Sequence, residues 1–322
     1  MLSLLATALP AAVVIADMPL PSPGQIALAA PAREWVRIDD DDLLVMTLAA
    51  PATNATASRR IVIQLMPSPI ARGWVTNIRR LATAHWWDGT SVNRVQDNYV
   101  AQWGDASEKK PLPPGLATIP ARDYEQDWRS LRAAGLAMSR NPVVSWGKSV
   151  KPVDVYARGL LWYGGFPLGT DAKPVRDDRR TWPIHCYGSV GVGRDLSPDT
   201  GSGAELYAVI GHAPRHLDRN IAVIGRVIEG MEHLSSLPRG TGDLGFYERP
   251  SERVTIDSIR LASQLPAAER PHFAYLSPAG TTWPRYVAAR RNRELPFFTH
   301  PAGAADICNI PVPIKALPMA DK

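Results

Sequence analysis

The sequence predicts a mainly β protein, and three observations carry this prediction. The chain of 322 residues contains 30 prolines and 24 glycines, which favour many turns over long helices. Two segments alternate apolar and polar residues as strands do, namely residues 60–65 (RIVIQL) and residues 253–262 (RVTIDSIRLA). Hydrophobic residues make up 45% of the chain, which is enough to build a sizeable core around such strands.

A helix is predicted directly after the first of these strands. Ser68 suits the N-cap and Pro69 the first helical position, because the proline ring presets φ where no N–H is needed. The apolar residues that follow recur at helical spacing: Ile70, Trp74, Ile78 and Leu81. An Asp-Gly turn at Asp88 and Gly89 then follows the helix.

The stretch most informative about function is residues 92–105, VNRVQDNYVAQWGD. It predicts two short strands joined by a turn at residues 96–98, with alternate side chains sharing a face. The first strand carries Val92 and Arg94, and the second carries Tyr99, Ala101 and Trp103. A fixed charge would thereby lie beside an apolar wall. The simpler alternative is that the arginine is a solvated surface group.

The ordered residues of this stretch resemble the first signature of the cyclophilin-type peptidyl-prolyl cis-trans isomerases. The matching positions are Arg94, Tyr99, Gln102, Gly104 and Asp105. Tyr99 stands where the family has phenylalanine. A match of five residues in order favours a functional Arg94 over a solvated one.

Residues 205–234 resemble the second signature of the same family, in which two strands flank a loop and a glycine-bounded helix follows. Tyr207 matches a pocket phenylalanine, and Leu217 and Asp218 match the leucine and aspartate of the loop. Two independent signatures in the family's order argue against coincidence.

The resemblance implies a cyclophilin-like fold, which is a closed antiparallel eight-stranded β-barrel capped by two α-helices. Here the barrel would carry a long insertion and a C-terminal extension, because the resemblance covers only about residues 59–105 and 188–262. The expected parts are an N-terminal apolar segment (1–33), an isomerase domain (34–262) with an insertion (106–187), and a C-terminal extension packing on the barrel (263–322).

The insertion is expected to lie over the barrel, where it could restrict or extend the substrate groove. Its aromatic residues argue for packing rather than disorder: Trp128, Trp146, Trp162, Tyr163 and Trp182. Helix-like spacing predicts a helix within residues 122–139, whereas residues 163–180 are rich in glycine, proline and charge. The C-terminal extension is expected to lie across the barrel as a strap with a short helix at residues 283–293.

The resemblance implies catalysis of rotation about the peptide bond before proline. That bond resists rotation with a barrier of ~18–20 kcal/mol, because nitrogen shares its lone pair with the carbonyl. As the bond twists, the lone pair localises on the prolyl nitrogen, which becomes a better hydrogen-bond acceptor. A guanidinium held against it stabilises the twisted state selectively, and this is the catalytic role expected of Arg94. The chemistry requires no nucleophile, no cofactor and no metal.

The resemblance also nominates the residues that hold the substrate. The apolar pocket for the proline ring is assigned to Tyr99, Val100, Tyr207 and Leu217. Gln102 is expected to hold the substrate backbone or to orient Arg94. Three further substrate-binding positions depart from the family pattern: Glu205, His216 and Ile221. Glu205 could pair with Arg94 and either orient it or blunt it, and the two tyrosine hydroxyls need partners if they are buried.

These departures leave a second function open, a cyclophilin-like binding or chaperone module that grips proline-containing segments with little turnover. In either case the expected partners are proline-containing polypeptides, and we expect a monomer. Basic residues number 36 against 31 acidic ones, a net charge of +5 that is spread along the chain without a dense basic stripe. This distribution argues against nucleic-acid binding.

The first sixteen residues, MLSLLATALPAAVVIA, are apolar and end before Asp17. This run is long enough for the core of a signal peptide but short for a membrane span, so we expect no stable membrane insertion. Export would make the mature protein periplasmic or secreted. If the run has no targeting role, the protein is cytoplasmic.

The cysteines and two further motifs suggest no additional chemistry. Cys186 and Cys308 either pair, which would tie the C-terminal tail to the barrel, or remain buried thiols. His212 and His216 are spaced like metal ligands on a helix, but the intervening proline disfavours one. Residues 240–245 satisfy G-x-G-x-x-G, yet a helix precedes and a strand follows, the reverse of a dinucleotide site, so a turn is predicted.

Overall fold

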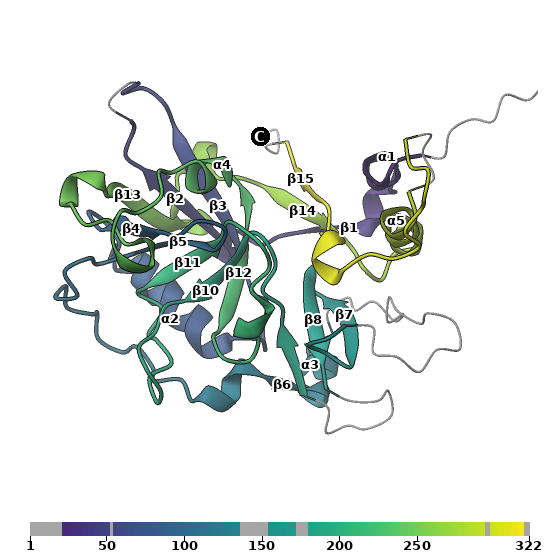
Figure 1. Cartoon of the computed structure of the whole chain (residues 1–322), viewed down its shortest axis with the longest axis horizontal. Coiled ribbons are helices and arrows are strands. Elements are labelled where there is room, and N and C mark those ends of the chain that lie inside the picture. The colour runs from purple at the N-terminus through teal and green to yellow at the C-terminus, as the bar shows by residue number, and fades with distance from the viewer. Residues whose placement is uncertain (1–20, 52–53, 136–153, 172–179, 294–296, 319–322) are drawn as a thin grey trace, which may run out of the picture.

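The computed structural model describes residues 21–51, 54–135, 154–171, 180–293 and 297–318. Its centre is a closed barrel of eight strands in the order β10-β11-β5-β4-β13-β2-β3-β12, each antiparallel to its neighbours (Figure 1). The strands are β2 (Leu43–Leu48), β3 (Arg59–Leu65), β4 (Ser91–Val95), β5 (Val100–Gly104), β10 (Ser189–Val192), β11 (Leu206–Val209), β12 (Val223–Glu229) and β13 (Val254–Leu261). The predicted mainly β, eight-stranded barrel is confirmed.

Two helices cap the barrel, α2 (Arg72–Thr83) and the single turn α4 (Glu232–Ser235) (Figure 1). The four apolar residues predicted to line one helical face are all buried: Ile70, Trp74, Ile78 and Leu81. The predicted start at Pro69 is wrong. Residues 67–70 form a turn in which Ile70 N donates to Pro67 O at 3.2 Å, and Ala71 takes a left-handed conformation with φ of 49°. The α-helical conformation therefore begins only at Arg72.

Strand β3 is present where the alternating pattern predicted it, but it is buried on both faces. Ile61 and Ile63 belong to the core inside the barrel. Val62 instead joins a second hydrophobic cluster on the outside of the barrel. Alternation of apolar and polar residues is typical of a strand buried on one face, but here other parts of the chain cover the outer face of β3 as well.

The described part of the insertion forms a sheet of its own in the order β6-β9-β8-β7. Its elements are β6 (Gln126–Asp127), α3 (Trp128–Ala133), β7 (Gly159–Tyr163), β8 (Phe166–Thr170) and β9 (Arg180–Pro183). The helix predicted within residues 122–139 is present as α3 but is shorter than the pattern, because β6 precedes it and the Asp127 side chain, which accepts from Ser130 N at 2.8 Å, caps its start. Residues 136–139 lie outside the described residues.

The predicted packing of the insertion's aromatic residues holds for those that can be placed. Trp162, Tyr163 and Trp182 are buried, and Trp128 packs partly buried against the barrel core. Trp146 lies outside the described residues.

The two ends of the chain meet in a third sheet and a helix pair. They contribute α1 (Pro23–Leu28), β1 (Trp35–Arg37), β14 (Phe273–Leu276), α5 (Thr282–Arg291) and β15 (Ile314–Ala316). The sheet order is β1-β14-β15, and α1 packs against α5, seen as the purple and yellow helices of Figure 1. The second cluster draws on these ends through Ile26 and Trp283, on the insertion through Trp162, and on the outer barrel through Val62. No helix in the described ranges is long and apolar enough to cross a membrane.

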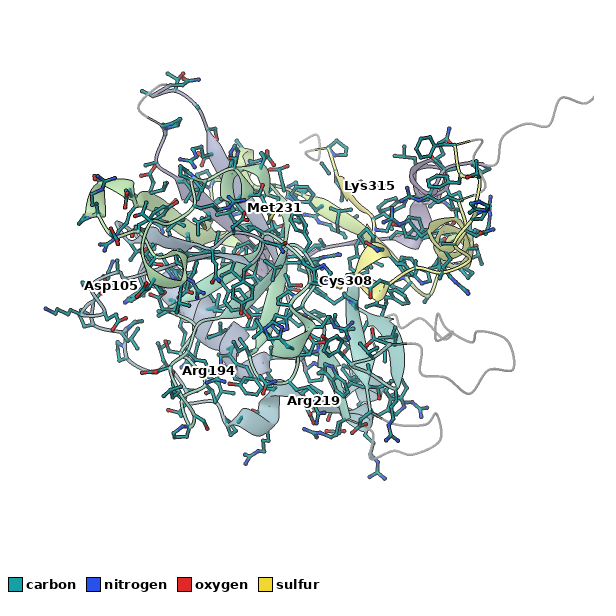
Figure 2. All side chains as sticks on the ribbon, viewed as in Figure 1. Asp105, Arg194, Arg219, Met231, Cys308 and Lys315 are labelled. Carbon is teal, nitrogen blue, oxygen red and sulfur yellow. A yellow bond between two sulfur atoms is a disulfide. The ribbon has the colours of Figure 1, made fainter. Side chains whose placement is uncertain are left out.

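A disulfide joins this second cluster across a sequence separation of 122 residues. Cys186, just after β9, and Cys308, between α5 and β15, have an S–S distance of 2.01 Å. Figure 2 places Cys308 between the barrel and the part that holds α1 and α5. Of the two alternatives left open by the sequence, the structure has the bridge.

Candidate functional site

The β4–β5 hairpin places Arg94 on the outer face of the barrel. The pairing of the two strands shifts between Val92 and Arg94, a β-bulge that inserts an extra residue. As a result Val92 and Val95 both point into the barrel core, while Arg94 is only part-buried. The prediction that Val92 and Arg94 share a face is therefore wrong, because the bulge interrupts the alternation.

Tyr99 does not share a face with Ala101 and Trp103 as predicted, because it lies in the turn before β5. Ala101 and Trp103 face the barrel core as expected. Tyr99 instead packs outside, beside Val100, Tyr207 and Val209. The apolar wall next to Arg94 therefore consists of different residues from those that strict alternation gives.

Three acceptors hold the Arg94 guanidinium in place. Its Nε donates to Leu244 O at 2.7 Å, Nη1 to Gln102 Oε1 at 3.1 Å, and Nη2 to Gln96 Oε1. The guanidinium carbon lies 5.7 Å from the centre of the Tyr99 ring and 5.3 Å from that of Phe246. Burial lowers the pKa of Arg94, but an arginine remains charged at neutral pH. The site thus presents an oriented cation between two aromatic rings.

An apolar cluster lies next to this cation. Val100 from β5 and Tyr207 and Val209 from β11 are buried together, and Tyr99, Leu217 and Ile221 pack against them. The two strands are neighbours in the barrel, with Tyr207 opposite Gln102. The His216 ring stacks on Tyr99 with centroids 6.4 Å apart. The structure therefore gathers the predicted pocket residues around one place.

The Tyr207 hydroxyl has a buried partner that the sequence did not reveal. It lies 2.9 Å from His185 Nε2, and His185 Nδ1 lies 2.9 Å from Asp218 Oδ1. Because a carboxylate only accepts, Nδ1 carries a proton, and in the neutral imidazole Nε2 then accepts from Tyr207. Burial raises the pKa of Tyr207 well above its ordinary value, so this hydroxyl keeps its proton and is able to donate.

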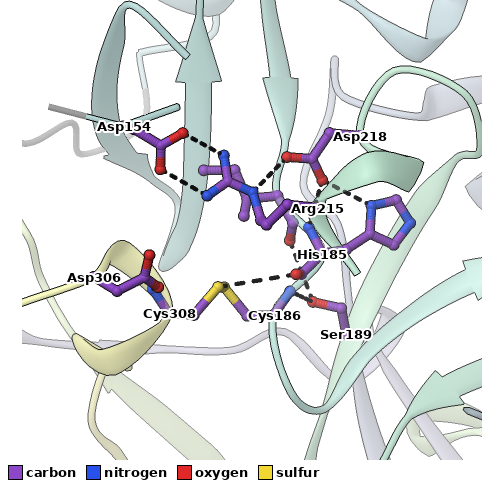
Figure 3. Close-up of a disulfide and its surroundings, with 9 residues drawn as sticks. Asp154, His185, Cys186, Ser189, Arg215, Asp218, Asp306 and Cys308 are labelled. Atoms are coloured by element: carbon purple, nitrogen blue, oxygen red, sulfur yellow. Dashed lines mark hydrogen bonds and ion pairs between the residues drawn. A yellow bond between two sulfur atoms is a disulfide. The ribbon is translucent and has the colours of Figure 1, made fainter. Parts of the chain in front are cut away.

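The chain of polar contacts continues into the insertion (Figure 3). Asp218 Oδ2 accepts from Arg215 Nε at 2.6 Å, and Arg215 makes two further bonds to Asp154, at 2.7 and 3.0 Å. Each of these three side chains is at most 6% exposed. We refer to Tyr207, His185, Asp218, Arg215 and Asp154 as the buried relay. It connects the pocket floor to the edge of the insertion, beside the disulfide.

Glu205 lies behind Gln102 rather than against Arg94. Gln102 Nε2 donates to Glu205 Oε2 at 3.5 Å, while Gln102 Oε1 accepts from Arg94. A Cβ at position 104 would come within 1.8 Å of Glu205 Oε1, which explains the glycine there. Burial raises the pKa of Glu205 to about 7, against the opposing effect of its hydrogen bonds with Gln102 and Asn93. Of the two predicted roles of Gln102, the contact with Arg94 is present in the structure.

Sequence reasoning missed the loop that contacts Arg94 from the other side. Leu244 and Phe246 lie in and just after the glycine-rich residues 240–245, which were correctly predicted as a turn but given no role. A Cβ at Gly240 would meet Gly245 O at 1.9 Å, so the glycine pattern marks a close backbone approach. The glycine pattern could be seen in the sequence, but the sequence did not indicate that this loop contacts Arg94.

A search of protein-family models matches residues 53–261 to the cyclophilin type peptidyl-prolyl cis-trans isomerase/CLD family. The chain belongs to this family. Among curated proteins it is similar to the peptidyl-prolyl cis-trans isomerase CYP23 of Arabidopsis thaliana, at 38% identity over 73 residues. That match spans 22% of this chain and 31% of the plant protein, so it covers about a third of the relative's length.

The solved structure of cyclophilin AquaCyp293 from Hirschia baltica resembles the cyclophilin described above over most of its length. The TM-score is 0.66 at 22% identity, covering 89% of this chain and 95% of the other. At this identity the likeness concerns the fold. It extends beyond residues 53–261, the range of the family model, because it covers 89% of this chain.

Proposed function

We propose that this cyclophilin catalyses cis-trans isomerisation of peptide bonds before proline, with Arg94 as the catalytic residue. The observation that carries the proposal is the oriented guanidinium beside an apolar cluster of Val100, Tyr207 and Leu217. Family membership supports it independently. The apolar wall would bind the pyrrolidine ring, and the cation would meet the prolyl nitrogen.

The hydrogen bonds of Arg94 support this role. A guanidinium has five N–H donors, of which the described contacts engage three, on Nε, Nη1 and Nη2. Each terminal nitrogen therefore keeps a second N–H for a substrate. Because the three contacts fix the group before the substrate arrives, little reorganisation is required as the lone pair develops.

The clients are proposed to be proline-containing segments of exported proteins, met in the periplasm or outside the cell. The Cys186–Cys308 bridge supports this location, since stable disulfides form mainly in oxidising compartments. The apolar N-terminal run points the same way. We propose that the protein acts as a monomer.

One observation favours a binding module with little turnover as a second candidate. The Nε of Arg94 donates to the backbone carbonyl of Leu244, which ties the side chain to a loop. If that contact holds the cation too far from the prolyl nitrogen, the pocket would bind proline without lowering the rotational barrier.

The experiment is a protease-coupled isomerisation assay on a proline tetrapeptide, combined with peptide titration. We expect clear turnover by the wild type and its loss in Arg94→Ala, with binding largely kept. Arg60→Ala is the matched control, because Arg60 is another barrel arginine whose partner Glu229 lies in a surface ion pair. Wild-type turnover no faster than the uncatalysed rate, with binding retained, would identify the binding module instead.

A further inference from the structure

A cavity of about 490 Å³ lies beside the proline pocket and has no part in the proposed catalytic step. Three separate parts of the chain line it. They are the barrel residues Asn98, Tyr99 and 212–216, the insertion residues 154–156, and Asp306 from the C-terminal segment. The barrel alone therefore could not form this cavity, because one wall comes from the insertion and one from the C-terminal segment.

The stacked rings of Tyr99 and His216 separate the cavity from the proposed proline pocket. Tyr99 packs on the pocket cluster and also lines the cavity, and His216, stacked on it, lines the cavity as well. The two ring centroids are 6.4 Å apart. Two residues of extended chain span about 7 Å, so a client that seats its proline in the pocket would bring a residue within two positions of it to the cavity.

The acidic and basic residues of the cavity lining are Asp154, Asp306, Arg215, His212 and His216. Arg215 binds Asp154 and also Asp218, which lies outside the lining, so the carboxylate left open to a ligand is that of Asp306. Asp306 Oδ1 accepts from Cys308 N, and among the described contacts Oδ2 has no partner. Figure 3 shows Asp154 and Asp306 on the same side of the disulfide.

Contacts within the protein hold both Asp154 and Asp306 in place. Asp154 is held by both terminal nitrogens of Arg215, whose guanidinium lies 5.0 Å from the Tyr156 ring. The disulfide anchors Cys308, two residues from Asp306. A ligand therefore meets the Asp306 carboxylate in a position that Cys308 already holds, which reduces the ordering cost of binding.

We propose that this cavity is a client subsite that takes a lysine or arginine side chain within two residues of the isomerised proline. The inference rests on the proposed function and names the class of client that it prefers. The methylene stem of such a side chain would lie along Tyr99 and Pro214, while its charge meets Asp306. A glutamate at the same client position would be repelled.

The test uses proline peptides in which one position at a time carries lysine, alanine or glutamate. The positions varied are the two residues before the proline and the two residues after it. Turnover efficiency is measured by exchange NMR, and affinity by titration of the same peptides. A partly exposed ion pair contributes about two- to fivefold, so lysine should exceed glutamate by that factor at one position. The preference should shrink as salt is added.

Two variants assign the preference to the cavity. Asp306→Asn keeps the acceptor for Cys308 N but removes the charge, so the lysine-to-glutamate ratio should fall towards one. Asp257→Asn, an exposed carboxylate on β13, is the matched control and should leave the ratio unchanged.

The outcomes separate the subsite from the catalytic proposal. Turnover that depends on Arg94 but shows no charge preference, or a lysine preference that Asp306→Asn does not reduce, would overturn the subsite and leave the isomerase intact. Peptide binding without turnover, with a lysine preference that the variant abolishes, would support the subsite and overturn the isomerase.

Discussion

Replacing Tyr207 by phenylalanine tests the relation between the pocket floor and the buried relay. The ring would still fill the pocket, because the change removes only the hydroxyl. That hydroxyl is the donor to His185 Nε2 at 2.9 Å, and His185 is fully buried. The substitution therefore leaves a buried acceptor without its partner, while the apolar surface offered to proline is unchanged.

The magnitude follows from the desolvation of that acceptor. Leaving one buried polar group unsatisfied costs about 1–3 kcal/mol of unfolding free energy. The His185 side chain is fully buried, and its Nδ1 is already committed to Asp218. We therefore expect Tyr207→Phe to lose stability in this range and to keep near wild-type turnover.

Chemical denaturation with the disulfide intact measures the loss, and the proline-peptide assay measures the turnover. Tyr187→Phe is the matched control, because Tyr187 is 56% exposed and its change should stay within about 0.5 kcal/mol. A Tyr207→Phe protein as stable as the wild type would refute the assignment of the proton and of the relay.

The remaining predictions concern other charged and covalent contacts. Burial raises the pKa of Glu205 from 4.5 to about 7, so the native state holds a proton that the unfolded chain releases in this window. The free energy of unfolding should thus fall as pH rises from 4.5 to 7, by up to roughly 3 kcal/mol, and Glu205→Gln should flatten the decline in pH-dependent denaturation. Arg215→Met leaves Asp154 and Asp218 buried without their cation, so denaturant titration should show that the free energy of unfolding falls by about 3–5 kcal/mol. Replacing Cys186 and Cys308 by serine opens a 122-residue loop and should cost about 2–5 kcal/mol, measured against the oxidised wild type; an unchanged midpoint would contradict this.

The candidate site could be predicted from sequence where its residues lie close together in the chain. Arg94, Tyr99 and Gln102 fall within nine positions, so their order alone marked the hairpin. The direction of their side chains could not be read in the same way. The bulge at Arg94 depends on how β4 pairs with β5, and strict alternation assigns that side chain the wrong neighbours.

The buried relay could not be predicted, because its members come from distant segments. His185 and Tyr207 are 22 residues apart, and Arg215 and Asp154 are 61 apart. The sequence showed that a buried tyrosine hydroxyl needs a partner, but only the packed structure identifies which one. The sheet of the insertion was missed for the same reason, since β6 pairs with β9 across more than fifty residues.

The most direct test of the catalytic role of Arg94 is the cis-trans exchange rate of a proline peptide, measured by NMR without a coupling protease. The wild type should accelerate exchange, and Arg94→Ala should lose about 100- to 1000-fold of that acceleration, as expected for the removal of one oriented donor. Arg94→Lys should recover only part of it, because a lysine cannot donate to Leu244, Gln102 and the substrate in the same fork. Acceleration by Arg94→Ala equal to that of the wild type would contradict the role proposed for this side chain.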